Sequence, residues 1–167
     1  MSEAALQQGL APVAGPDTRL LVLGSFPGVA SLQVQQYYGH PRNHFWRLMG
    51  EVLDEPLYEL PYAERLATLR RHRVGLWDVI SRAQREGSLD SSIRAHIGSD
   101  LLNLLAELPA VTTLAFNGGT AARIGLKQLG NEAGRYRIVA LPSSSPAYTL
   151  AYAHKRTAWL ALQAAVT

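Results

Sequence analysis

The chain has 167 residues, a net charge of +3 at neutral pH and no cysteine. This length suits a single domain over residues 1–167 with a sizeable hydrophobic core. The absence of cysteine excludes disulfides, thiolate nucleophiles, zinc–thiolate sites and iron–sulfur clusters. The small excess of basic residues permits a nucleic-acid partner but does not require one.

The apolar runs are too short to cross a bilayer, which takes about 20 residues. The N-terminus lacks a basic segment followed by an apolar one, so no secretory signal peptide is expected. These features favour a cytoplasmic protein without a membrane partner.

In chain order, residues 1–17 are small and polar and predict a loose arm or a short leading helix. The continuous apolar run at 19–24 predicts a strand buried on both faces, as in a parallel sheet. The sequence next predicts helices over 43–53 and 62–73, a strand over 74–80 and a loop over 81–92.

The second half of the chain predicts a helix over 99–108, capped by Ser99 or Asp100. Strands are expected over 111–116 and 136–141, and helices over 120–129 and 154–166. Strands that alternate with helices of about three turns indicate βαβ units. We therefore predict an α/β protein with three α/β/α layers around a central four-stranded parallel sheet.

Three of the predicted strands end in unusual sequences: GSFPG at 24–28, FNGG at 116–119 and PSSSPA at 142–147. Because the carboxyl ends of parallel strands lie on one edge of the sheet, these segments should converge on one cleft. Glycines let backbone N–H groups approach a ligand, and serine hydroxyls typically contact phosphates. Each segment taken alone is also compatible with an ordinary turn.

The segment YYGHPRNHFW at 37–46 combines aromatic rings with polar groups, which suits a pocket for a flat polar ligand such as a nucleobase. Asn43 could cap the following helix or position a water molecule. Asp78, in a strand that looks buried, could pin a loop or read a base. His40, His44 and His154 are interpreted as packing or surface residues, and no metal site is assigned.

Together, GSFPG, YYGHPRNHFW, LWDV, FNGG and LPSSSPA resemble the uracil-DNA glycosylase superfamily, and within it most closely the hypoxanthine-DNA (deoxyinosine) glycosylases. The resemblance extends from about residue 19 to 159. The mismatch-specific branch carries a GINPG turn whose asparagine prepares the attacking water, but Phe26 occupies that position here. In the hypoxanthine family the asparagines of the PRN segment and of the third strand end act instead. The resemblance thus implies Asn43 and Asn117 as catalytic residues.

The fold and activity implied are those of a monofunctional DNA glycosylase that flips out and hydrolytically excises a deaminated base, with hypoxanthine as the leading candidate, and leaves an abasic site in base excision repair. Damaged DNA would be the partner of a monomer that needs no metal, iron–sulfur cluster or other cofactor. No lysine is near these segments, so no Schiff-base lyase step is expected. Residues 147–152 would form a wedge in the vacated base stack. Tyr38 would stack on the base, with Phe26 or Phe45 behind its ring. The expected base-binding residues are Ser25, Phe26, Tyr38, Phe45 and Asp78, and the expected DNA-binding residues are Gly28, Ser143, Ser144, Ser145, Ala147 and Tyr148.

Other functions remain compatible with the sequence. A glycosylase for uracil or for G:T and G:U mismatches would differ only in the hydrogen bonds of its pocket. A catalytically inert nucleic-acid-binding relative, or an RNA-directed protein, would not need Asn43 and Asn117. A hydrolase of free nucleosides would not need the serine-rich segment as a phosphate grip.

Overall fold

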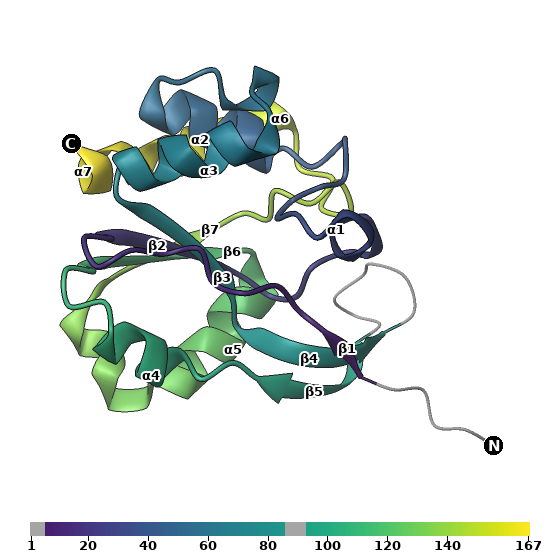
Figure 1. Cartoon of the computed structure of the whole chain (residues 1–167), viewed down its shortest axis with the longest axis vertical. Helices are drawn as coiled ribbons and strands as arrows, with labels where there is room; N and C mark the ends of the chain where they lie inside the picture. Colours follow the sequence, from purple (N-terminus) through teal and green to yellow (C-terminus); the bar gives the residue numbers. More distant parts are fainter. Residues whose placement is uncertain (1–5, 86–92) are drawn as a thin grey trace.

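A parallel sheet with strand order β3-β2-β6-β7 lies at the centre of the computed structural model, which describes residues 6–85 and 93–167 (Figure 1). Gly24 is in register with Asp78, and Asn117 with Leu141, so the strands end almost level. The continuous apolar sequence explains the burial of the inner strands. The predicted four-stranded parallel sheet is confirmed. Its strands are β2 (Leu20–Gly24), β3 (Val74–Asp78), β6 (Thr113–Asn117) and β7 (Arg137–Leu141).

Helices cover both faces of this sheet, which confirms the three predicted layers (Figure 1). The buried rings of Phe45, Trp46 and Trp159 lie on one face, and that of Phe116 on the other. One layer contains α2 (Phe45–Leu53), α3 (Tyr62–Arg71), α6 (Tyr152–Trp159) and α7 (Gln163–Val166), with the short 3₁₀ helices η1 (Leu57–Glu59) and η4 (Leu160–Leu162). The other layer contains α4 (Leu101–Ala106), α5 (Gly119–Leu129) and η3 (Gly130–Arg135).

A second, antiparallel sheet has the strand order β1-β4-β5. It consists of β1 (Gln7–Gln8), β4 (Ile80–Arg85) and β5 (Ile93–Gly98). The predicted loop over 81–92 is therefore wrong for 81–85, while residues 86–92 lie outside the described part. Sequence could not show this strand because cross-strand hydrogen bonds, rather than apolar alternation, hold it in place.

The described part of the N-terminal segment is neither a loose arm nor a helix. Strand β1 pairs with β4, and Val13 forms an antiparallel bridge with Leu76. The Tyr37 hydroxyl also donates a hydrogen bond to the Ala11 carbonyl at 2.7 Å. Long-range backbone contacts, which local sequence does not encode, thus hold this segment against the body of the protein.

The remaining differences are at helix ends. Helix α1 (Val29–Val34) was not predicted, and the last predicted helix starts at Tyr152 and is interrupted by η4. Of the two proposed caps of α4, Asp100 is the one whose side chain accepts from the Asn103 N–H. Across residues 6–85 and 93–167, no helix is long and apolar enough to span a membrane.

Candidate active site

A cavity of about 480 Å³ opens where the carboxyl ends of the parallel strands meet. Residues from 24–31, 37–43 and 143–148 line it, together with Asp78 and the turn from β6 into α5. The predicted convergence of GSFPG, FNGG and PSSSPA on one cleft is confirmed. Every expected site residue lines this cavity except Phe45.

Phe45 lies behind the ring of Tyr38, which was one of the two alternatives predicted for it. The two ring centroids are 3.9 Å apart with an interplanar angle of 24°, and Phe45 is fully buried. Tyr38 has a φ of 54°, a left-handed conformation that is uncommon for a bulky residue. Two hydrogen bonds hold the backbone before Tyr38 in this conformation: the Trp46 indole donates to the Tyr37 carbonyl, and the Tyr62 hydroxyl accepts from the Tyr37 N–H.

The hydroxyl of Tyr38 lies close to the Asp78 carboxylate over Gly24. A Cβ atom on Gly24 would be 3.1 Å from the Tyr38 hydroxyl and 2.5 Å from Asp78 Oδ1, so only glycine leaves room for both. Burial, and then the charge of Asp78, raise the pKa of Tyr38, which therefore remains a protonated donor. The Asn117 side chain interacts with this hydroxyl and partly offsets the rise in pKa, but the buried O–H has no acceptor of good hydrogen-bond geometry among the described residues. A ligand acceptor that reached it would remove a desolvation cost of about 1–3 kcal/mol.

Asn43 forms a turn at the entrance to α2 and also lines the cavity. Its Oδ1 accepts from the Phe45 N–H at 2.9 Å, and its own N–H donates to the His40 carbonyl at 2.9 Å. This side-chain turn fixes the amide at the cavity wall. The carbonyl oxygen retains a second lone pair. The N-cap of α2 is His44, so the cap considered for Asn43 from sequence is wrong, and Asn43 forms a side-chain turn one position before the helix. This turn is compatible with the functional role.

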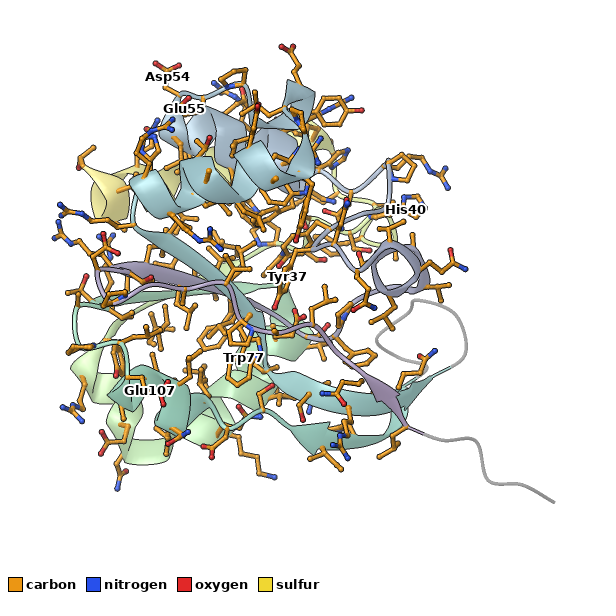
Figure 2. All side chains as sticks on the ribbon, viewed as in Figure 1. Tyr37, His40, Asp54, Glu55, Trp77 and Glu107 are labelled. Atoms are coloured by element: carbon orange, nitrogen blue, oxygen red, sulfur yellow. The ribbon has the colours of Figure 1, made fainter. Side chains whose placement is uncertain are left out.

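His40 lines the cavity, although its sequence suggested only packing or surface exposure. Its Nδ1 accepts from the Arg42 N–H at 3.0 Å, which leaves Nε2 as the protonated nitrogen of the neutral ring. Figure 2 shows His40 at the periphery beside α1, whereas Tyr37 lies in the interior. The position of His40 depends on the fold of the 37–44 turn, so its residue type alone gave no signal.

Asn117 joins the end of β6 to the serine-rich loop. Its Nδ2 donates to Ser144 Oγ and its Oδ1 accepts from the Ser144 N–H, both at 2.9 Å. Ser144 is only 1% exposed, so it points inward, unlike its half-buried neighbours. Gly118 has a φ of 99°, and a Cβ there would lie 3.1 Å from the Cβ of Ser143. The backbone after β6 therefore packs tightly under the loop.

Two other serines stabilise the loop through their oxygens. Ser143 Oγ accepts from the Ser145 N–H, and Ser145 Oγ accepts from the Ala147 N–H, both at 3.1 Å. Each of these hydroxyls lines the cavity and keeps its own proton for a further hydrogen bond. Beyond them, Ala147 and Tyr148 are exposed at the cavity rim.

Residues 147–152, predicted to act as a wedge in DNA, are only partly exposed in the structure. Tyr152 begins α6, and its hydroxyl donates to Glu51 at 2.5 Å. Its side chain is therefore committed to the packing of α6 on α2. Only the exposed part of the segment, around Tyr148, is available at the rim.

The expectation that no lysine is near these segments is wrong. Lys155, on α6, donates from Nζ to the Ser145 carbonyl at 3.1 Å and is fully buried. Sequence missed it because it follows the serines by ten positions and reaches the loop only through the fold. Residues Gly118–Thr120 also line the cavity, so the positive N-terminal end of α5 faces it.

Comparison with known proteins agrees with the motifs. Residues 11–165 match the model of the uracil DNA glycosylase superfamily. A protein named hypoxanthine DNA glycosylase from Methanosarcina acetivorans is 36% identical over 159 residues, covering 94% of this chain and 98% of its own. A protein of the same name from Methanosarcina barkeri is 36% identical over 155 residues, covering 92% and 95%.

A solution NMR structure from Methanosarcina acetivorans, for which uracil DNA glycosylase is given as the candidate activity, has a TM-score of 0.83 and 36% identity. The match covers 95% of this chain and 97% of that one. The resemblance inferred from the motifs is confirmed. By sequence, length and fold, this chain belongs to the uracil DNA glycosylase superfamily.

Proposed function

We propose that the protein is a monofunctional DNA glycosylase that hydrolyses the N-glycosidic bond of a deaminated base in DNA, most readily deoxyinosine. One observation carries this proposal: the cavity combines the Asn43 amide and the serine hydroxyls at one sheet edge with a buried Tyr38 hydroxyl whose O–H has no acceptor among the described residues. The names of the Methanosarcina relatives give hypoxanthine as the base. Phe26 occupies the turn position at which the mismatch-specific branch carries a water-positioning asparagine. We therefore assign the positioning of water to Asn43.

In this proposal the target nucleotide leaves the duplex and enters the cavity, at a cost of a few kcal/mol. Hypoxanthine has acceptor atoms at O6, N3 and N7, and the Tyr38 hydroxyl is a buried donor in need of an acceptor. The Asp78 carboxylate over Gly24 would accept from the N1–H of the base. Uracil also offers an acceptor and an N–H donor, so the size of the cavity and the fit to a purine decide the preference.

Asn43 would position the attacking water through the second lone pair of its carbonyl oxygen. As the C1′–N9 bond breaks, its electron pair passes to the base, and the water oxygen bonds to C1′. The first-turn N–H groups of α5, which have no intrahelical acceptors, would stabilise the negative charge on the departing base. A proton from the water finally neutralises the base, leaving hypoxanthine and an abasic sugar.

The serine-rich loop would bind the phosphates beside the target nucleotide. The hydroxyls of Ser143 and Ser145 are the donors, while Ser144 contributes through its backbone position, held by Asn117. Tyr148, exposed at the rim, would fill the gap in the base stack. One lesion fits one cavity, so the enzyme would act as a monomer.

Labelled duplexes with a single deoxyinosine or a single deoxyuridine, treated with the protein and then with hot alkali, test this function. Strand cleavage at deoxyinosine is the expected result. Cleavage at deoxyuridine alone would support the glycosylase reaction but contradict deoxyinosine as the preferred substrate. Hydrolysis of free deoxyinosine at a comparable rate would instead identify a nucleoside hydrolase. Binding of lesion DNA by folded protein without any cleavage would leave an inert relative as the better description.

A further inference from the structure

A fully buried lysine lies behind the serine-rich loop. Lys155 is 0% exposed, and its Nζ donates to the Ser145 carbonyl at 3.1 Å. The ammonium also lies 5.6 Å from the ring centroid of Tyr148, which fits a cation–π contact. In the described part of the chain no carboxylate forms an ion pair with it.

A buried positive charge without a carboxylate is costly for the folded protein. Its burial lowers the pKa of Lys155. After burial itself, the charge of Lys155 is the main cause that lowers the pKa of His44, on the same side of the loop. A methionine could fill a similar space without this cost, so packing alone does not explain the ammonium group.

The loop places this charge directly behind groups that face the cavity. The Ser145 carbonyl accepts from Lys155 and from the Tyr148 N–H at 3.0 Å. The Ser145 N–H, which belongs to the preceding peptide group, donates to Ser143 Oγ. Ser143, Ser145 and Tyr148 all line the cavity. In a region of low dielectric constant the charge of the ammonium acts through space across this loop and favours an anion bound on its other side.

We propose that Lys155 is a positioning residue that supplies the internal counter-charge for a DNA phosphodiester bound on the outer side of the loop by Ser143 and Ser145. This proposal rests on the proposed function. Lys155 acts through the loop and does not touch the reacting atoms. The bound phosphate compensates for the cost of the buried charge, so the free protein carries an incomplete ion pair that the substrate completes.

The same lysine could otherwise be a nucleophile that attacks C1′ of the abasic sugar. Such an attack needs a neutral amine with access to the cavity. Lys155 is completely buried and its Nζ is engaged by the loop carbonyl. The structure therefore favours the electrostatic role, and chemical trapping separates the two.

The sequence contains only two lysines, Lys127 and Lys155, which gives a matched control. Lys127 is exposed on α5 and occurs in none of the cavity contacts. The variants are Lys155→Met, which removes the charge, Lys155→Arg, which keeps it, and Lys127→Met. Affinity for a duplex with a tetrahydrofuran abasic analogue is measured over a series of NaCl concentrations, with thermal unfolding of each variant.

Lys155→Met is expected to bind about tenfold more weakly, with a plot of log affinity against log salt that is shallower by up to about one unit. Lys155→Arg should recover the steeper slope, and Lys127→Met should match the wild type. An unchanged slope in folded Lys155→Met would contradict the counter-charge, because loss of packing alone does not change salt dependence.

The wild-type protein provides a second measurement in case the variants do not fold. Selective ¹³C labelling gives two lysine Cε signals, which Lys127→Met assigns. The pKa of Lys155 should rise on binding the abasic duplex, and the Lys127 signal is the internal reference. Equal behaviour of the two lysines would overturn the proposal.

Two outcomes identify the source of a failure. If wild-type protein neither excises deoxyinosine nor binds the abasic duplex, both this proposal and the proposed function fall. If excision occurs but the salt slope and the Lys155 titration do not respond, only the present proposal falls. A borohydride-trapped covalent adduct that is lost in Lys155→Met would replace the positioning role with a nucleophilic one.

Discussion

Asn117 and Ser144 form a reciprocal pair in which one side-chain amide satisfies both the hydroxyl and the backbone N–H of the same serine. This pair joins the end of β6 to the loop that follows β7. Asn117 thus holds the site together, and it is also one of the two residues for which the family resemblance implies a catalytic role. The two possible roles of Asn117, locking the loop and assisting the reaction, predict different results for its variants.

Asn117→Ala should reduce the free energy of unfolding by about 2–3 kcal/mol, because it removes two buried hydrogen bonds and leaves the Ser144 N–H without an acceptor. Asn117→Asp should retain most of that stability, since a carboxylate accepts from both the N–H and the hydroxyl of Ser144. Urea unfolding checks the stability, and single-turnover excision checks the activity. Full activity in Asn117→Asp with none in folded Asn117→Ala would indicate that the loop lock is its main function.

Asn43→Ala should lower single-turnover excision of deoxyinosine by about a hundredfold or more, as expected for loss of a positioned polar group. Loss of the turn onto the Phe45 N–H should cost only about 1 kcal/mol of stability. Asn43→Ser is the matched control, because serine makes a similar turn but has no amide. If Asn43→Ser excises as fast as the wild type, Asn43 serves only to start α2.

Tyr38→Phe should leave stability unchanged or slightly higher, because it removes a buried hydroxyl whose O–H lacks an acceptor in residues 6–83 and 96–167. The ring and its stacking on Phe45 remain. Excision of deoxyinosine should nevertheless fall about tenfold if the hydroxyl donates to the base. Phe45→Leu, which disturbs the support but keeps the hydroxyl, should instead lower stability. Equal excision by Tyr38→Phe and wild type would exclude the hydroxyl from base recognition.

Glu51 connects α2 to α6, accepting from the Tyr152 hydroxyl and from Arg156. The hydrogen bond from Tyr152, and then Arg156, lower the pKa of Glu51, despite partial burial. Because its folded pKa is depressed, the carboxylate stabilises the protein above its unfolded pKa, and this contribution disappears as the pH falls through the folded value. The same hydrogen bond helps to raise the pKa of Tyr152 to about 12, after burial.

Glu51→Gln should therefore be less stable than the wild type at pH 7, by less than about 1 kcal/mol because the pair is partly exposed. The difference should shrink as the pH falls from 5 towards 3. Urea unfolding at several pH values measures it. Glu107→Gln, which makes the same chemical change at an exposed position in the opposite layer (Figure 2), is the control. A Glu51→Gln difference that does not depend on pH would contradict the assignment.

Local sequence was sufficient for the elements that make the scaffold. The apolar run of 20–24 and the helices that follow each strand encode burial and period directly, so the parallel sheet and its layers followed from them. The second sheet could not be predicted from such local patterns, because β1 and β4 are held together by hydrogen bonds between segments more than seventy residues apart. The residue pattern within one segment does not identify the distant strand with which it pairs.

The same contrast holds at the site. Sequence determined which chemical groups are present and that the ends of β2, β6 and β7 would bring them to one edge. Only the tertiary structure decided their roles: Phe45 supports Tyr38, Ser144 points inward onto Asn117, and Lys155 lies buried behind the loop. The direction and burial of a side chain depend on packing between distant elements. Residue type and spacing along the chain do not contain that information.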